Sequence, residues 1–537
     1  MWAQPLAPLD SVALSAFVAA IPLIVVLVLM GVLRKSGLLA SACGLATTAL
    51  LAIGVWHMPL ALALWSVVFG FAFALLPILW IVFAALWLYN LAVETGAFEA
   101  LRRWMLAHAS GDACVQAILV AFCFGALLEG SAGFGAPVAV TAFLLVGLGF
   151  EARKAVVVAL LANTAPVAFG GVGVPIVALA GVTGLDLMKL SAMVGRQLPM
   201  LSLILPAYLA LLVAGPAGLR RTWPAALVAG GSFAVAQYLV SNLWGPYATD
   251  ILSAIVSILA LTAFLRIWNV SARDGVAAAA SRMGEAGTVA AVAGRFSSPV
   301  AAWLPWGVLS VVMVLWSYFH LFPKGQIPIA VPTLDNAVRI TLYDKPYAAV
   351  FNLQPLAGGT AVLVALAITA LCFRVPPRTL LRNGGRTLRQ LRVPGLTVLL
   401  IVGLAYLYNY SGMVYTLGAA VAHAGHFFPI VSSYLGWLAC FLTGSDTAAN
   451  VLFGNLQVAA AHQLDLNPVL LAATNSSGAV AGKMISPQNI AIGVSTIGLI
   501  GQEGKVMQST FWHSILLAAM IGVIAYTQGY YFPSIVP

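Results

Sequence analysis

Charged residues are scarce in this chain. They make up 7% of its 537 residues, whereas hydrophobic residues make up 62%. Soluble domains carry about 25% charged residues, so this composition excludes a protein that covers itself with polar surface in water. We expect the lipid bilayer to be its solvent and expect no separate soluble domain.

Motifs for catalysis and metal binding are also missing. The five cysteines form no CxxC pair, so neither a disulfide framework nor a metal site is expected. No Walker A loop, GxSxG elbow or HExxH motif is present. The net charge of +10 comes from connectors between apolar segments, which is not the basic face that nucleic acid requires. We therefore expect no enzyme, metal, cofactor or nucleic-acid partner, and nothing indicates an oligomeric state.

Long apolar runs predict an all-α polytopic membrane protein, because about 20 apolar residues span a bilayer. The first run is too long for a signal peptide. Uninterrupted spans are expected at 12–33, 38–56, 60–93, 193–215, 222–241, 248–266, 301–322, 351–373, 393–410 and 508–531. Interrupted segments are expected at 113–150, 155–183, 430–462 and 469–500. This gives about 12 spanning helices, with 60–93 read as one tilted helix or as two.

The connector charges predict the topology. Residues 374–392 hold six arginines and no acid, which makes this segment cytoplasmic by the positive-inside rule. Every other basic cluster then falls on the same side if 113–150 and 430–462 are re-entrant hairpins. The prediction is a first half at 1–270, a cytoplasmic linker at 271–300 and a second half at 301–537, with both termini periplasmic.

The two halves carry the same pattern. Gly130-Ser131 precedes Asn163, Gly170 and Pro175, and equivalent residues follow about 312 positions later: Gly444-Ser445, Asn475, Gly482 and Pro487. Hairpin tips need non-helical backbone, which Gly130, Gly133 and Gly135 allow. The pattern predicts two inverted repeats, each a hairpin followed by a broken helix, and such paired interruptions point to a transporter's binding site.

Polar residues near these interruptions are the candidate binding residues. Broken helices expose backbone N–H groups that favour an anion, and hydroxyls and amides suit a small hydroxylated anion. The candidates are Ser131, Asn163, Thr164, Ser445, Asn475, Ser476 and Ser477. The alternative is that these side chains only cap the helices.

Three charged residues lie within the interrupted segments, where each costs about 2.5–3.5 kcal/mol. Glu129 and Asp446 flank the two Gly-Ser pairs and are candidates for proton coupling. Lys483 either holds a substrate carboxylate or pairs with Asp446. Helix capping or ion pairing is the alternative role for both acids.

These segments resemble the lactate permease family of bacterial secondary transporters. The likeness runs through FCFGALLEGSAGFGAPVAV, NTAPVAFGGVGVPI, FLTGSDTAANVLFG and GKMISPQNIAI and covers nearly the whole chain. The resemblance implies proton-coupled uptake of L-lactate, with D-lactate and glycolate as further substrates, across the inner membrane. Ser476-Ser477 stands where Thr-Thr is expected, and Ala448-Ala449 stands where hydroxyl residues are common.

The resulting hypothesis is a symporter of a 2-hydroxy-monocarboxylate and a proton. Three alternatives stay open. A sodium-coupled carboxylate carrier would place Na⁺ at the two tips. A membrane-embedded enzyme would use Asp446 and His462, and a passive anion channel would show flux that no proton gradient drives uphill.

Overall fold

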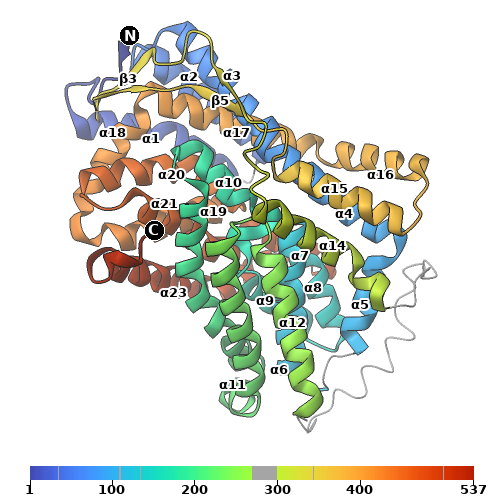
Figure 1. Ribbon diagram of the computed structural model, residues 1–537. Helices are drawn as coiled ribbons and strands as arrows, with labels where there is room; N and C mark the ends of the chain where they lie inside the picture. Colours follow the sequence, from blue (N-terminus) through green and yellow to red (C-terminus); the bar gives the residue numbers. More distant parts are fainter. Residues whose placement is uncertain (34, 108–110, 134, 269–298, 343, 500) are drawn as a thin grey trace.

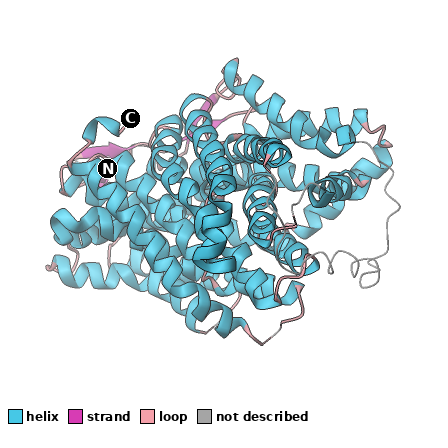
Figure 2. Cartoon of the chain, turned by 90° about the horizontal axis from the view of Figure 1, so that it is seen from below, coloured by secondary structure: helices cyan, strands magenta, loops and turns pink. Residues whose placement is uncertain are grey.

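The computed structural model describes residues 1–537 except 34, 108–110, 134, 269–298, 343 and 500. The chain is almost entirely helical (Figures 1 and 2), and its short strands lie at one end of the molecule, beside the N-terminus. The prediction of an all-α membrane protein is confirmed. Within the described residues, ten helices are long and apolar enough to cross a membrane, or eleven if the bent pair Ala152–Ala162 and Val167–Thr183 is one span.

The first helices follow the predicted apolar runs. Ser11 and Ser36 cap α1 and α2 by accepting hydrogen bonds from backbone N–H groups of their first turns. The elements are α1 (Val12–Leu27), η1 (Val28–Val32), α2 (Gly37–Gly54), α3 (Leu60–Phe73), η2 (Ala74–Leu79), α4 (Trp80–Thr95) and α5 (Ala97–Ala107). Helices α3 and α4 join through the π-helical η2 into one apolar helix of 36 residues, Leu60–Thr95. The run 60–93 therefore forms one continuous helix and one candidate span.

The first predicted hairpin and broken helix are both present. The hairpin consists of α6 (Ala113–Gln116), η3 (Ala117–Phe124) and α7 (Gly125–Ser131), followed by α8 (Ala136–Gly147). The broken helix consists of α9 (Ala152–Ala162), η4 (Val167–Phe169) and α10 (Gly170–Thr183), bent by 65°. Gly133 and Gly135 have positive φ at the hairpin tip. Gly130 was expected at this turn, but it lies within α7, so that prediction is wrong.

Two long helices complete the first half. Helix α11 (Leu187–Leu243) is broken at Ala214 and Gly215, where the backbone is not helical. Its two parts run antiparallel, because Gly195 packs against Ser241 and Gly230 packs against the backbone of Leu203. They correspond to the predicted spans 193–215 and 222–241. Helix α12 (Thr249–Ile267) follows.

The second half begins with α14 and a small β structure. The elements are α14 (Pro299–Tyr318), β2 (Ile327–Ala330), β3 (Val338–Ile340), β4 (Lys345–Tyr347), β5 (Val350–Leu353), α15 (Gly358–Cys372), α16 (Pro377–Gln390) and α17 (Arg392–Ser411). Strand β1 (Trp2–Ala3) pairs in parallel with β3, β3 pairs antiparallel with β4, and β2 pairs antiparallel with β5. The predicted start of span 351–373 is wrong, because its first residues form β5 and a turn and the helix begins at Gly358. Exposed and buried positions alternate in β5, which the apolar composition of the run concealed.

The second hairpin and the second broken helix lie near the end of the chain. They follow α18 (Met413–Val421) and η6 (Ala422–Phe427) and comprise α19 (Phe428–Thr443), α20 (Asp446–Gln463), α21 (Pro468–Lys483) and α22 (Pro487–Thr496). Helix α23 (Glu503–Tyr530) and η7 (Pro533–Ile535) complete the structure. Both halves thus contain two helices joined by a turn, followed by a broken helix; that these helix pairs are re-entrant hairpins stays a prediction.

The hairpins and broken helices of the two halves interlock. Gly454 of α20 packs against Leu179 of α10, and Gly493 of α22 packs against Val138 of α8. Each broken helix therefore places its second segment on the hairpin of the other half. Within the second half, a Cβ on Gly478 of α21 would meet the Ser433 carbonyl oxygen of α19 at 2.2 Å, so these backbones touch as in other small-residue helix contacts.

Candidate functional site

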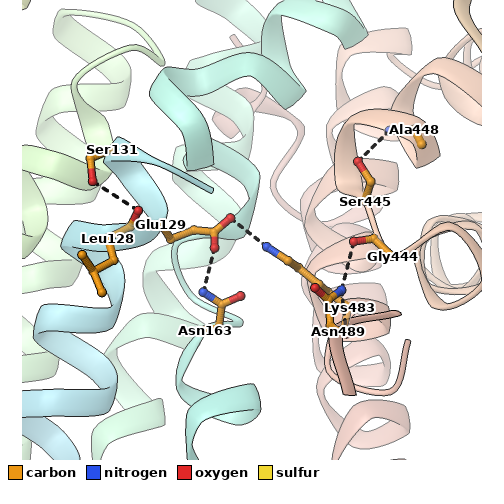
Figure 3. A network of polar contacts seen from close by, with 9 residues as sticks. All are labelled: Leu128, Glu129, Ser131, Asn163, Gly444, Ser445, Ala448, Lys483 and Asn489. Carbon is orange, nitrogen blue, oxygen red and sulfur yellow. Dashed lines mark hydrogen bonds and ion pairs between the residues drawn. The ribbon is translucent and has the colours of Figure 1, made fainter. Parts of the chain in front are cut away.

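Glu129 stands at the centre of the polar interior. It lies near the end of α7, and 3% of its surface is exposed. Its Oε2 accepts a hydrogen bond of 2.9 Å from Asn163 Nδ2, and its Oε1 lies 2.7 Å from Lys483 Nζ (Figure 3). A Cβ on Gly170 would lie 2.6 Å from Oε1, so the carboxylate needs a glycine at the start of α10.

Lys483 reaches Glu129 from the other half of the chain. It is the last residue of α21, where the helix dipole favours a cation, and it is buried. The pairing with Asp446 considered from the sequence is wrong, because the ion pair of Lys483 is with Glu129. Removing one partner of such a buried pair leaves an uncompensated charge, which typically costs about 3–5 kcal/mol.

Asn163 and Thr164 lie where the first broken helix is interrupted. Asn163 is the C-cap residue of α9, and both side chains are buried. Thr164 Oγ1 has no hydrogen-bond partner among the described residues. A buried polar atom left unpaired costs about 1–3 kcal/mol, so this hydroxyl is available to a ligand that enters the site.

A narrow crevice lies between these residues. Its described lining is Val138, Leu160, Asn163, Thr164, Val167, Val480, Lys483, Met484 and Asn489. Among those nine, Lys483 is the charged residue. The crevice is too narrow to hold a water molecule as it stands, so a ligand can enter only if the lining elements move apart.

Asn489 ties the crevice to the second hairpin tip, and the sequence reasoning missed it. It lies in the first turn of α22, and its Nδ2 donates a 3.0 Å hydrogen bond to the Gly444 carbonyl oxygen. The Cβ that Gly135 lacks would lie 3.5 Å from Asn489 Oδ1. Asn489 therefore bonds the tip of the second hairpin and lies close to Gly135 at the tip of the first (Figure 3 shows it beside Lys483 and Gly444).

Asn475, Ser476 and Asp446 belong to a second hydrogen-bonded group. Ser476 donates to Asp446 Oδ2 at 2.9 Å, and Asn475 Nδ2 donates to Asn450 Oδ1 at 3.0 Å. Asn450 also donates to Ser476 Oγ and to the Pro175 carbonyl oxygen. Hydrogen bonds thus gather the predicted residues into two groups, one around Glu129 and one around Asp446.

Two of the four candidate serines bond to the backbone. Ser131 Oγ donates to the Leu127 carbonyl oxygen at 2.7 Å, and Ser445 caps α20 by accepting from Ala448 N. Ser477 Oγ is buried and has no hydrogen-bond partner in the described part of the chain. The capping alternative therefore accounts for Ser131 and Ser445.

The two broken helices are interrupted at different places relative to their shared pattern. Asn163 lies at a break, whereas Asn475 lies within α21, which continues to Lys483. The second broken helix is interrupted between Lys483 and Pro487. The equivalent positions of the first half, about 312 residues earlier, are Gly171, Val172 and Gly173, whose backbone is left-handed. The Asn-hydroxyl pairs are equivalent in sequence but differ in local structure.

Another buried acid, Asp250, was also missed from the sequence. It lies in the first turn of α12 with 1% of its surface exposed. Both carboxyl oxygens lack a hydrogen-bond partner among the residues described. Its position at the edge of the predicted span 248–266 is where charged residues at a membrane boundary are expected. Only the structure shows that it is buried.

Comparison with known proteins assigns this arrangement to a family. A family model described as L-lactate permease matches residues 15–532. The chain is 41% identical to the glycolate permease GlcA of Escherichia coli K12, over 99% of this chain and 98% of that protein. It is 40% identical to the L-lactate permeases of Escherichia coli K12 and Bacillus subtilis 168, over the full length of each chain.

Proposed function

The chain belongs to the L-lactate permease family, and from that premise we propose that it takes up L-lactate by proton symport. D-lactate and glycolate are the proposed further substrates. The names of its relatives, L-lactate permease and glycolate permease, support small 2-hydroxy-monocarboxylates as the substrate class. The observation that carries the mechanism is the buried Glu129–Lys483 pair beside the crevice.

The pair couples the anion to the proton. Lys483 has one carboxylate partner at 2.7 Å, namely Glu129. A substrate carboxylate that takes this place leaves Glu129 as a buried anion without its cation, which is costly. Protonation of Glu129 removes that cost, so the anion and the proton bind together and the site stays neutral. A neutral load crosses a region of low dielectric constant more easily than a charged one.

The groups around Lys483 suit the rest of a 2-hydroxy acid. Thr164 Oγ1 has no hydrogen-bond partner among the described residues, and Asn163 is released from Glu129 when that carboxyl is protonated and moves. Both line the crevice with Lys483 and Asn489. We assign the substrate carboxylate to Lys483 and the substrate hydroxyl to Thr164 and Asn163. The Asp446 group, with Asn475, Ser476 and Ser477, is the second candidate position for the proton and for substrate contact.

The proposal includes an orientation and a location. The six arginines of 374–392, most of them on α16, support a cytoplasmic position for that segment. Counting spans from there places both termini in the periplasm of a bacterial inner membrane. Labelling of single introduced cysteines near each terminus, in intact cells and in inverted vesicles, tests this orientation.

The decisive test is uptake of labelled L-lactate into proteoliposomes of the purified protein, with an inward proton gradient and no sodium. We expect accumulation above equilibrium that a protonophore abolishes. Accumulation that requires sodium would replace the proton by Na⁺ as the coupling ion. Flux that never exceeds equilibrium would indicate a passive channel and contradict the proposal.

Two variants assign the proton-binding group. We expect E129Q to lose uphill accumulation but to keep lactate–lactate exchange, because a neutral side chain leaves Lys483 free for the substrate. D446N is the matched variant of the second hairpin. If D446N loses accumulation and E129Q keeps it, Asp446 binds the transported proton.

A further inference from the structure

Asp250 is a buried acid that the proposed mechanism does not use. Its carboxyl group is 1% exposed, and within the described residues neither oxygen has a hydrogen-bond partner. A helix-capping role would require one of these oxygens to accept from a backbone N–H group. Burying a charged carboxylate without partners is far more costly than burying a protonated one. The geometry therefore favours Asp250 in its protonated form.

Asp250 lies directly against the segment that carries Glu129. A Cβ on Gly130, the next residue after Glu129, would lie 2.7 Å from the Cβ of Asp250. Helix α12 can approach α7 this closely only because residue 130 is a glycine. This contact gives Gly130 a packing role within α7. It also means that the buried acids Glu129 and Asp250 lie on adjacent helices.

The surroundings of Asp250 contain few other ionisable groups. Glu129 and Lys483 are the charged side chains that act on it. Helix α12 packs against α7, η3, α10, α11 and α14. Of these, α10 has no ionisable side chain, η3 contributes Cys123, and α14 has Tyr318 at its exposed end. The ionisable residues of α11 are Lys189, Arg196, Tyr208, Arg220, Arg221 and Tyr238, and Tyr247 precedes α12 in the chain.

The position of Asp250 along α12 indicates from which side of the membrane a proton would reach it. Helix α12 ends at Ile267, and the proposed topology puts this end at the cytoplasmic face. Asp250 is in the first turn, at the opposite end, which the same assignment places toward the periplasm. Lactate uptake driven by an inward proton gradient takes protons from that side.

We propose that Asp250 is a proton-relay residue that passes protons from the periplasmic side to Glu129. The inference rests on proton symport as the function of this chain. In the relay, the O–H bond of Asp250 breaks as an O–H bond forms on Glu129. Asp250 then regains a proton from water, and Glu129 releases Lys483 to the substrate carboxylate. Asp250 acts on the rate of proton delivery, whereas Glu129 fixes the coupling.

The test compares wild type, D250N and D186N in proteoliposomes. Asp186 caps α11 at an exposed position, so D186N is a matched control for an acid at a helix start. Three quantities are measured: the initial rate of proton-driven net lactate uptake, lactate–lactate exchange at equal pH, and protons entering per lactate. For D250N we expect net uptake to slow by roughly 100-fold, the lower range of what a positioned proton-transfer group contributes. Exchange and the proton-to-lactate ratio should stay unchanged, and D186N should match wild type.

Each other result overturns the relay. Net uptake by D250N at the wild-type rate would show that protons bypass Asp250. Exchange that falls in parallel with net uptake would show a structural role. Absence of proton-driven accumulation in the wild type would refute proton symport itself, which separates that failure from a failure of the relay alone.

An infrared measurement tests the starting state without relying on the activity of a variant. Protonated Asp250 should give a carboxylic acid C=O band in wild type near neutral pH that D250N lacks. Identical bands in the two proteins would show that Asp250 carries no proton in the resting state and would contradict the proposal.

Discussion

The Glu129–Lys483 pair allows a quantitative test of the site. At the 2.7 Å separation of Lys483 Nζ and Glu129 Oε1, an effective dielectric constant of about 20 gives an attraction of about 6 kcal/mol. Desolvation of the two charges offsets much of this attraction. The loss of one partner is therefore expected to cost about 3–5 kcal/mol, whereas replacing both partners by neutral groups of similar size costs far less.

The perturbations are E129Q, K483M and the double variant, with K189M as a control at an exposed lysine. The assay is the half-life of the folded protein in detergent at a fixed temperature, because membrane proteins of this size often unfold irreversibly. If the whole cost falls on the unfolding rate, 3–5 kcal/mol shortens the half-life by roughly 150- to 5,000-fold in each single variant. We expect the double variant to recover most of this loss and K189M to equal wild type. Losses that simply add in the double variant would show that the two charges are not coupled and would refute the reasoning.

Three further predictions follow from single contacts. G170A should reduce lactate uptake by about 100-fold, because the new methyl group displaces the Glu129 carboxylate, and a shift of about 1 Å can have such an effect; uptake equal to wild type would contradict the assigned geometry. T164V should weaken L-lactate binding by about 2- to 12-fold, the value of one hydrogen bond, and should leave propionate binding unchanged in competition assays; equal effects on both acids would exclude contact with the substrate hydroxyl. G478V should destabilise the fold by about 1–3 kcal/mol through overpacking, measured as a shorter half-life in detergent, because its side chain meets the Ser433 backbone; an unchanged half-life would show that α19 and α21 can separate without cost.

The sequence predicted the elements of this fold better than their contacts. Glycines, prolines and connector charges identify both hairpins and both broken helices, because each of these signals acts within a few residues. The turn predicted at Gly130 was wrong, because a glycine can permit either a turn or the close packing of two helices. Only the contact with Asp250 of α12 shows that Gly130 has the packing role. Residues 351–357 were read as helix because their composition is apolar, although they form β5 and a turn.

The site was predictable as a set of residues but not as a set of pairs. Glu129, Asn163 and Lys483 stood out as polar residues in apolar surroundings, and the structure joins them. The partner of Lys483 was not predictable, since Glu129 lies 354 positions away and the pairing depends on how the two halves pack. Asp250 lies at the boundary of a predicted span, and Asn489 lies beside a break that a proline marks. Neither position indicates a buried polar residue, so only the structure reveals that both are buried.

The ion pair joins residues from the two halves of the chain, so breaking it affects how these halves can move. Glu129 belongs to the first hairpin and Lys483 to the second broken helix, while Asn489 bonds the tip of the second hairpin. Because α10 packs on α20 and α22 packs on α8, neither hairpin can shift without carrying the broken helix of the other half. A crevice closed to water then opens only when these interlocked elements move against the surrounding helices or when the Glu129–Lys483 contact lengthens. In the proposed mechanism, protonation of Glu129 weakens that contact, so the event that admits the anion also removes one of the bonds that hold the crevice closed.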